Sequence, residues 1–484
     1  MNSMLRFNII KFITVVSISL LVFTACSKKE DSTVTPTDNT QQINQWIYDT
    51  MSDAYYWYDQ LPAISTLSLT DASDSFFEKL VYQRSTVDRF SMVTDDVDEL
   101  EKEFNGVSKV FGIRYMLGYL DNTQTNVGLV LTQVITGSPA AVVGLNRGDI
   151  IVKINGQNIT SSNFSSLMGN ETVTFTLGSI TNGSIAATSN TVSVTKTEVT
   201  ENPVAFSSIV QKTSANKTIG YLVYTQFVPG LDSGDTLKYD NQLRSIFADF
   251  KAAGVNELVL DLRFNPGGYI SSATTLASLI VNNLTTNKVF FKDQYNSKYQ
   301  TYFAKQYGSN IFNNYFSIEK NNIGNNLNRV FVLTSNGTAS SSELVINGLK
   351  PYMQVITIGE HTYGKNLFGT LVADDQKRWK WGIYMMLGIT QNANGESDYG
   401  NINGIAPTYA VDDNVLPLQP LGNDYEPLFN KALTVMGVSV PNTNGARQNA
   451  GILLNYTSHE NYADNPMRNE KFMIKNYLPK LINK

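Results

Sequence analysis

Strand and helix patterns alternate between residues 203 and 440, and this order constrains the fold more than any other feature of the chain. Three apolar runs predict buried strands, at residues 219–227, 257–262 and 330–334. Helical patterns at residues 239–253 and 271–281 lie between them. This alternation predicts an α/β domain over residues 203–440, in which the loops at the strand ends are available for chemistry.

Two regions of different character precede the α/β domain. Residues 43–105 have helical spacing and many aromatic side chains, which predicts an N-terminal helical domain with an aromatic core. Residues 106–200 have short β-like runs separated by Gly, Asn and Ser turns. The expected fold class is therefore α/β (α+β) multidomain. Residues 441–484 form a C-terminal extension with little signal, apart from a short helix predicted near residues 471–478.

A specific motif stands within the β-rich region, with the sequence GSPAAVVGLNRGDIIVKING at residues 137–156. It predicts a short helix after Pro139, a glycine stop, a Gly-Asp turn, and a strand that ends at an Asn-Gly turn. This order resembles a bacterial PDZ domain. The resemblance implies that Phe111, Gly112 and Ile113 form the loop that binds a peptide's C-terminal carboxylate, while the exposed sheet edge adds the peptide as a strand.

The N-terminus of the chain predicts export. Basic residues precede an apolar run at residues 12–23, which suits a secretory signal and is short for a membrane-spanning helix. Cys26, the only cysteine, follows small residues, so the segment resembles a bacterial lipoprotein signal. We predict a signal peptide at residues 1–25 and a lipid anchor on Cys26. A cleaved ordinary signal with an incidental cysteine is the alternative.

A polar tether is predicted at residues 26–42, between the lipid anchor and the folded part of the chain. The Lys-Glu-Asp sequence at residues 29–31 resembles a lipoprotein surface-export signal. We therefore expect the protein in the cell envelope, anchored to a bacterial membrane, with the outer membrane or the cell surface as candidate locations.

The chemistry is predicted to begin at Ser340. The sequence VFVLTSNGTASSSEL at residues 330–344 predicts a buried strand, a small-residue turn and a helix. Ser340 and Glu343 have the spacing of a capping box, which places Ser340 at the positive end of a helix, where backbone N–H groups can stabilise an oxyanion. From this motif alone, Ser340 is either a nucleophile or only a helix cap.

Two further glycine-rich turns follow strand patterns. Lys365 lies in the sequence GEHTYGK, after an apolar run and 25 residues beyond Ser340. Gly267 and Gly268 end the sequence LVLDLRFNPGG, whose turn can bring bare backbone N–H groups close to a ligand.

Together the three turns resemble the carboxyl-terminal processing (tail-specific) serine peptidases, an S41-type family that uses a Ser-Lys pair and carries a PDZ domain. The resemblance covers about residues 107–432, and the helical leader suits the lipoprotein branch of that family. It implies a serine endopeptidase that cleaves unfolded or C-terminally exposed polypeptides in the cell envelope. An inactive, peptide-binding lipoprotein on a peptidase scaffold is the alternative.

The resemblance also assigns roles. Ser340 takes the nucleophile position, chosen over its neighbours by its offset from the motif's glutamate, and Lys365 takes the general-base position. The oxyanion donors are the N–H of Ser341 and the N–H of Gly267 or Gly268. Many family members place an aspartate and others a glutamine where this chain has Pro351 and Gly369, so no third catalytic residue is assigned.

A lysine base must be neutral. Its pKa of about 10.4 has to fall by roughly 3 units to be half-deprotonated near pH 7. Burial can supply this shift, and the nearby Tyr363, Leu367 and Phe368 are suitable apolar surroundings. His361 is the competing base, since it lies close to Lys365 in sequence, whereas His459 lies in the polar tail.

Partners follow from the same observations. Polypeptides, bound through free C-termini, are the expected substrates, and the lipid anchor provides the membrane contact. No basic block is present, so nucleic acid is not expected as a partner. No cofactor or metal is expected, because no His, Cys and carboxylate residues have ligand spacing. The sequence does not indicate an oligomeric state.

Overall fold

The computed structural model describes residues 39–120, 124–181, 184–413, 415–440, 452–453, 455–456, 462–464 and 466–476. The predicted signal peptide, Cys26 and His459 lie outside these residues. The described part mixes helices with sheets and confirms the expected α/β (α+β) multidomain class. No helix within it is both long and apolar enough to cross a membrane.

A six-stranded sheet forms the centre of the α/β domain, in the order β10-β11-β12-β16-β17-β20. Its strands are β10 (Val204–Lys212), β11 (Lys217–Tyr224), β12 (Glu257–Asp261), β16 (Arg329–Thr334), β17 (Gln354–Gly359) and β20 (Tyr409–Ala410). All neighbours from β11 to β20 pair in parallel, so the predicted strands end at one edge of the sheet. The three glycine-rich turns therefore meet at that edge.

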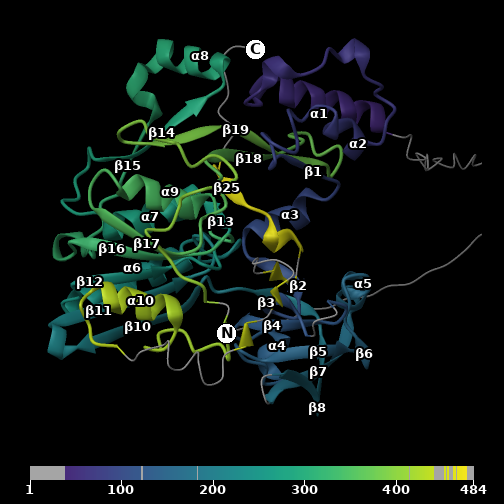
Figure 1. Cartoon of the computed structure of the whole chain (residues 1–484). Coiled ribbons are helices and arrows are strands. Elements are labelled where there is room, and N and C mark those ends of the chain that lie inside the picture. The colour runs from purple at the N-terminus through teal and green to yellow at the C-terminus, as the bar shows by residue number, and fades with distance from the viewer. Residues whose placement is uncertain are drawn as a thin grey trace, which may run out of the picture. The chain divides into compact units, whose positions relative to one another are not determined.

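Helices cover both faces of this sheet (Figure 1). They are α6 (Lys238–Ala252), α7 (Ile270–Ile280), α9 (Ser341–Leu349) and α10 (Pro427–Val435). Leu258 and Leu260 pack into one core cluster with residues of α6, α7 and α9, while Val259 packs with α10 on the other face. Alternate residues of β12 are thus buried on opposite faces, as expected for an interior parallel strand.

A second sheet of seven strands has the order β13-β25-β18-β19-β14-β15, with β1 paired to β19. Its strands are β1 (Met92–Thr94), β13 (Gly267–Tyr269), β14 (Val289–Tyr295), β15 (Asn313–Tyr315), β18 (Leu367–Ala373), β19 (Gly382–Asn392) and β25 (Phe472–Ile474), and α8 (Ser297–Tyr307) follows β14. Figure 1 shows β25, in yellow, near the centre of the molecule. It pairs with β13 and β18, so the end of the chain closes this sheet.

The helix predicted at residues 471–478 was wrong where the structure describes it, because residues 472–474 form β25. Strand partners on both sides satisfy its backbone groups, and this tertiary pairing outweighs the local helical pattern. Residues 477 and 478 lie outside the described part.

The N-terminal helices are α1 (Thr40–Ala54), α2 (Ser73–Glu78) and α3 (Val97–Phe104). α1 begins at Thr40, so the last residues of the predicted tether are helical. The aromatic side chains of this helical region are buried as predicted, and Met51, Tyr55 and Phe76 share their cluster with Ala273 and Phe290 of the α/β domain. Short helices cannot bury their apolar faces alone and pack instead against the larger domain.

The β-rich region has a core of its own around Leu129, Ile151 and Phe175. Its elements are β2 (Val107–Val110), β3 (Ile113–Tyr119), β4 (Val127–Val134), α4 (Pro139–Val142), β5 (Ile150–Ile154), β6 (Gln157–Asn158), α5 (Phe164–Gly169), β7 (Thr172–Thr181), β8 (Ser184–Thr195) and β9 (Thr197–Thr200). α4 begins after Ser138, whose Oγ accepts a hydrogen bond from the N–H of Ala141. The short helix predicted after Pro139 is therefore confirmed.

Short strands from the end of the chain complete the molecule. They are β22 (Ile452–Leu453), which pairs with β21 (Val415–Leu416), and β23 (Asn455–Tyr456) and β24 (Tyr462–Ala463), which both pair with β3. A 3₁₀ helix at Pro466–Asn469 leads from β24 towards β25. Along the chain, the described strands of the C-terminal extension thus pair first with β21, then with β3 of the β-rich region, and last with the seven-stranded sheet.

Candidate active site

Ser340 lies between the end of β16 and the first residue of α9. Its backbone has φ 63° and ψ −113°, a conformation that a residue with a Cβ adopts only under strain. The side chain is fully buried, and its Oγ has no hydrogen-bond partner among the described residues. A strained serine whose hydroxyl is not used as a structural cap favours the nucleophile over the cap interpretation.

The carboxylate of Glu343 joins the Ser340 turn to the Lys365 turn. One oxygen accepts hydrogen bonds from the backbone N–H groups of Ser340 and Lys365, at 2.7 and 2.8 Å. The other accepts from the Thr362 hydroxyl at 2.5 Å and from the Gly364 N–H at 2.7 Å. Burial raises the pKa of Glu343 to about 7, although these four donors oppose the shift. A single buried carboxylate therefore sets the separation of the two turns.

Lys365 is fully buried, as a neutral base requires. Its Nζ donates hydrogen bonds to the carbonyl oxygen of Lys471 at 2.5 Å and to the hydroxyl of Tyr384 at 3.3 Å. Burial lowers the pKa of Lys365 to about 7, against the opposing charges of Asp88, Glu470 and Glu343. A substantial fraction of this lysine is therefore neutral near pH 7.

The apolar surroundings of Lys365 differ in part from the predicted ones. The rings of Phe90 and Tyr384 lie over its Nζ, at 4.6 and 5.2 Å to their centroids. Tyr363 packs edge-on against Phe90, whereas Phe368 lies against Lys475 instead. Phe90 and Tyr384 come from segments far from Lys365 in sequence, and no local motif indicates them.

The glycine turn after β12 lies against Ser340. Gly267 has φ 113° and Gly268 has φ 131°, and a Cβ on Gly267 would come within 2.7 Å of the Ser340 Cβ. The N–H of Gly267 is taken by the Asn265 side chain at 2.9 Å, and the Ser341 hydroxyl donates to the Gly268 carbonyl at 2.7 Å. The sequence motif contained Asn265 but did not reveal its role in shaping this turn.

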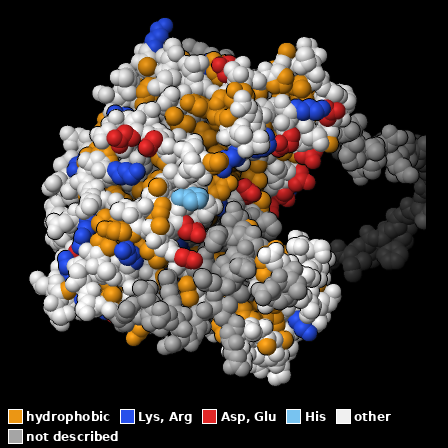
Figure 2. Space-filling view, viewed as in Figure 1, with side chains coloured by type: hydrophobic (Ala, Val, Ile, Leu, Met, Phe, Trp, Pro, Cys, Tyr) orange, Lys and Arg blue, Asp and Glu red, His pale blue; other side chains and the backbone are white. Residues whose placement is uncertain are grey.

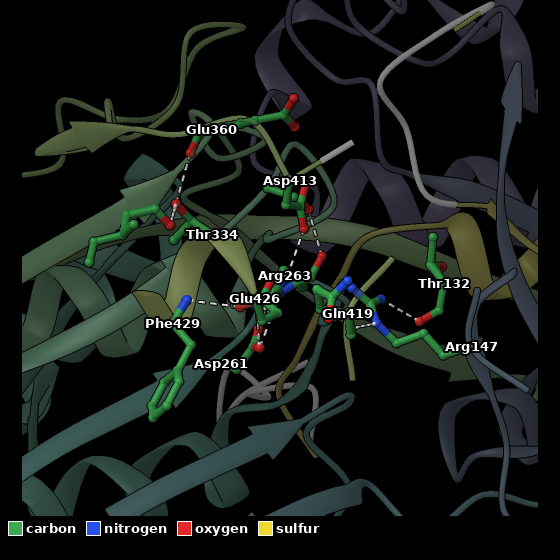
Figure 3. Close-up of polar contacts among 12 residues, drawn as sticks. Thr132, Arg147, Asp261, Arg263, Thr334, Glu360, Asp413, Gln419, Glu426 and Phe429 are labelled. Atoms are coloured by element: carbon green, nitrogen blue, oxygen red, sulfur yellow. Dashed lines mark hydrogen bonds and ion pairs between the residues drawn. The ribbon is translucent and has the colours of Figure 1, made fainter. Parts of the chain in front are cut away.

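A buried charge cluster surrounds Arg263, which lies at the start of the same turn (Figure 3). The guanidinium of Arg263 donates to Asp261 at 3.0 Å and to Glu426 and Asp413 at 2.7 Å each. Burial by itself lowers the pKa of Arg263, but these three carboxylates outweigh it and hold the pKa well above its ordinary value. Nearby, Arg147 of the β-rich region donates to the carbonyls of Gln419 and Thr132.

Among the described residues, no hydrogen bond joins the side chain of His361, the competing base candidate, to that of Ser340. His361 is exposed, and its Nδ1 lies 2.9 Å from the Thr362 carbonyl and 3.5 Å from the Asn336 amide. Figure 2 shows a histidine side chain at the molecular surface, in pale blue.

The two positions where a third catalytic residue was sought lie elsewhere. Pro351 lies just past α9, and Gly369 lies in β18, where its carbonyl accepts a hydrogen bond from the Lys475 N–H. Neither position supplies a partner for Lys365.

The loop predicted to bind a peptide's carboxylate holds the side-chain carboxylate of Asp464 in this structure. The N–H groups of Phe111 and Gly112 donate to Oδ2 of Asp464, at 2.6 and 2.9 Å, and the Ile113 carbonyl accepts from the Asp464 N–H. Two adjacent N–H groups that share one carboxylate oxygen form the kind of site that binds a peptide carboxylate. The sequence did not predict that this chain itself would supply the carboxylate.

Three regions match models of known protein families. Residues 218–411 match peptidase family S41, residues 42–92 match the peptidase S41 N-terminal domain, and residues 130–167 match a PDZ domain. The first match contains both Ser340 and Lys365, and the third contains the motif of the β-rich region.

Curated relatives and a solved structure agree with these matches. The chloroplastic C-terminal processing peptidase of Tetradesmus obliquus is 25% identical over 307 residues, and the carboxyl-terminal-processing protease of a Picosynechococcus strain is 26% identical over 296. Each alignment covers 60% of this chain and 60% of the relative. A crystal structure of a Bacteroides fragilis protein described as an S41 protease has a TM-score of 0.68 and 28% identity, covering 81% of this chain and 97% of that one.

Proposed function

Since the chain belongs to peptidase family S41, we propose that it is a serine endopeptidase of the C-terminal processing type, with Ser340 as nucleophile and Lys365 as general base. The observation that carries this proposal is the buried Lys365, whose pKa is lowered to about 7 and whose backbone shares the Glu343 carboxylate with that of Ser340. A lysine that can lose its proton near pH 7, in a turn joined to that of a strained serine, is the arrangement that Ser-Lys acyl transfer needs.

In the proposed reaction, neutral Lys365 takes the proton of the Ser340 hydroxyl while Oγ forms a bond to the carbonyl carbon of the scissile peptide. The tetrahedral intermediate then breaks its C–N bond, and the lysine ammonium returns the proton to the leaving amine. Water then attacks the resulting ester while Lys365 accepts its proton. The C–Oγ bond breaks, the lysine ammonium returns this proton to Oγ, and the acid product leaves.

The oxyanion of the intermediate needs N–H donors. We assign the N–H of Ser341, at the start of α9, and the N–H of Gly268. The N–H of Gly267 is less suited because Asn265 Oδ1 accepts from it. The fixed turn geometry means that these donors need no reorganisation as the negative charge develops.

The proposed substrates are unfolded polypeptides or polypeptides with exposed C-termini. The loop at Phe111, Gly112 and Ile113 and the edge of β3 support this class, because together they suit a strand that ends in a carboxylate. The proposed place of action is the bacterial cell envelope, with the enzyme held to a membrane by a lipid on Cys26.

The direct test uses the full chain with the single variants Ser340→Ala and Lys365→Ala. Cleavage of β-casein, an unstructured protein, and labelling by a serine-directed acylating probe are measured for each. Both variants should lose cleavage, and Ser340→Ala should lose labelling, while circular dichroism remains that of the parent. Cleavage retained by Lys365→Ala would contradict the dyad, and a parent chain that binds peptides but is neither labelled nor active would identify an inactive scaffold.

A further inference from the structure

Residues 462–464 lie along the edge of β3, where the PDZ resemblance places a bound peptide. β24 pairs antiparallel with β3, with Tyr462 opposite Tyr115 and Ala463 opposite Arg114. Upstream, β23 also pairs antiparallel with β3. The segment therefore adds a strand to the exposed edge of β3, in the position expected for a bound peptide.

Asp464 completes this resemblance to a bound peptide. Its N–H donates to the Ile113 carbonyl at 3.2 Å, which continues the β3 pairing by one residue. Its side-chain oxygen Oδ2 then accepts from the N–H groups of Phe111 and Gly112. A side-chain carboxylate thus stands where the terminal carboxylate of a peptide would bind. Unlike a peptide terminus, the chain continues past this point.

Beyond the 3₁₀ helix, the same segment crosses the proposed catalytic centre. The carbonyl of Lys471 accepts the hydrogen bond from Lys365 Nζ at 2.5 Å. The carbonyl oxygen of Phe472 lies against Gly267, since a Cβ placed there would be 2.2 Å from it and 2.7 Å from the Ser340 Cβ. The carbonyl of Lys471 therefore lies beside Lys365, and the next carbonyl, that of Phe472, lies beside the Gly267 turn that packs against Ser340.

Side-chain packing holds the segment in this position. Phe472 stacks against Phe104 and Tyr384, with ring centroids 4.5 and 5.2 Å apart. Met473 and its neighbours in β25 are buried, and the Tyr384 hydroxyl hydrogen-bonds both the N–H and the carbonyl of Met473. The ammonium of Lys475 forms a buried ion pair with Asp293. A polypeptide cannot reach Ser340 while this strand is in place.

The catalytic pair is also not engaged in this arrangement. Lys365 Nζ uses its hydrogen bonds on Lys471 and Tyr384, and Ser340 Oγ has no partner among the described residues. Proton transfer from the serine needs a hydrogen bond between these two groups. While the Lys471 carbonyl accepts its hydrogen bond, the Nζ of Lys365 is not engaged with the Ser340 hydroxyl.

We propose that residues 462–464 and 466–476 act as an intramolecular inhibitor, which occupies the PDZ groove through Asp464 and the catalytic centre through β25. A polypeptide with a free C-terminus competes for the groove, and cleavage follows once the segment has left both sites. The inhibitor role rests on the proposed peptidase function, whereas the occupation of the groove can be tested without catalysis.

The first test measures peptide binding in the full chain carrying Ser340→Ala, so that cleavage does not interfere. The probe is a fluorescein-labelled hexapeptide that ends in Tyr-Ala with a free carboxylate, followed by fluorescence anisotropy. Since a groove that is rarely vacant weakens apparent affinity in proportion, adding Asp464→Ala should tighten binding roughly tenfold or more. The exposed residue change Asp249→Ala is the matched control and should leave affinity unchanged. Equal affinity with and without Asp464 would overturn the proposal.

The second test holds residues 462–464 on β3 with an engineered disulfide. Tyr115→Cys and Tyr462→Cys are combined with Cys26→Ser, which removes the only native cysteine. Opposed residues on antiparallel strands have Cα atoms about 4.5–5.5 Å apart, within disulfide range. Oxidation should abolish both hexapeptide binding and β-casein cleavage, and dithiothreitol should restore both. The chain with Tyr462→Cys alone should not respond to oxidation.

The two failures are distinguishable. A crosslinked chain that binds the hexapeptide and cleaves β-casein as fast as its reduced form would overturn the inhibitor. A chain that never cleaves and never accepts an acylating probe, reduced or not, would overturn the proposed peptidase function. In that case the binding measurements would still decide whether the segment occupies the groove.

Discussion

Arg263 and Lys365 are both buried in the turns that shape this site, but their surroundings shift their pKa values in opposite directions. Arg263 is surrounded by Asp261, Glu426 and Asp413, and its charge is fully compensated. Among the described residues, the Nζ of Lys365 hydrogen-bonds only to a carbonyl oxygen and a tyrosine hydroxyl, and two aromatic rings lie over it. The two side chains have the same burial and opposite pKa shifts.

This difference suits Arg263 to a structural role and Lys365 to the proposed role of a base. A buried charge with carboxylate partners stays charged and holds its turn in position, because its desolvation is offset by short ion pairs. A buried amine without a carboxylate in contact loses its proton near neutral pH, because the charged form has no compensation for the lost water. The comparison predicts that the two residues respond in opposite directions to the same substitution.

The largest effect is expected for Lys365→Met. β-Casein cleavage should fall by a factor on the order of 10³ or more, because the proposed general base is lost. At the same time the free energy of unfolding at pH 7 should rise by about 2–4 kcal/mol, since a methionine of similar size needs no desolvation of charge. Chemical denaturation followed by circular dichroism checks the second part.

The sign of this stability change follows from the pKa. The folded-state pKa is lowered to about 7 from the ordinary value, so between these two pH values the unfolded chain binds a proton that the folded chain does not. Stability contributed by this group therefore rises with pH across that window. The gain from Lys365→Met should be largest at pH 7 and should vanish near pH 10.5. A gain that grows with pH would contradict the assignment.

Arg263→Met should have the opposite effect on stability. It leaves Asp261 and Glu426 buried without their cation, which is expected to cost about 3–5 kcal/mol. The midpoint of urea unfolding should fall, and cleavage should fall with it because the Gly267 turn loses its support. An unchanged midpoint would mean that the cluster is not a scaffold.

The pH dependence of cleavage provides an intermediate effect. With a substrate strand covering Lys365 in place of β25, the proposed base stays buried, so kcat/KM should decrease about tenfold for each pH unit below 7 and reach a plateau above it. Protonation of Glu343, whose pKa is also about 7, removes an acceptor from both turns and acts in the same direction. The limiting slope should therefore lie between one and two. A rate that is flat from pH 5 to 7 would rule out a titrating base in this range.

The smallest effect is expected at an exposed lysine. Lys109 forms an ion pair with Glu171, and both side chains are 58% exposed. Lys109→Met should change the unfolding free energy by less than about 1 kcal/mol and leave cleavage unaltered, because water screens such pairs. It is the matched control for Lys365→Met, and a large effect here would mean that the lysine-to-methionine change itself alters stability.

Much of the site follows from local sequence. The strand, small-residue turn and helix around Ser340 lie where the sequence predicts them, as does the glycine turn after β12. The match to peptidase family S41 confirms the family that these motifs indicated. Local patterns suffice here because each turn is encoded within about a dozen consecutive residues, by strand length, glycine positions and capping.

The sequence predicted that Lys365 has apolar surroundings but not which residues lie over its Nζ. Its burial could be expected from the chemistry, but Phe90 and Tyr384 supply it, from segments that are distant along the chain. The strand at Phe472–Ile474 has a helical local pattern and becomes a strand through its partners β13 and β18. No periodicity within a short window contains information about such partners.

By itself, the sequence determined the family, the order of the elements and the residues that stand at the three turns. Only the tertiary structure decided the protonation tendency of Lys365, the shared use of Glu343, and the position of Asp464 and β25 on the two sites. The physical reason is that turn geometry depends on neighbours in the chain, whereas desolvation and strand pairing depend on which distant segments close over a group. Ser340 could therefore be predicted from the sequence, but the segment that covers it could not.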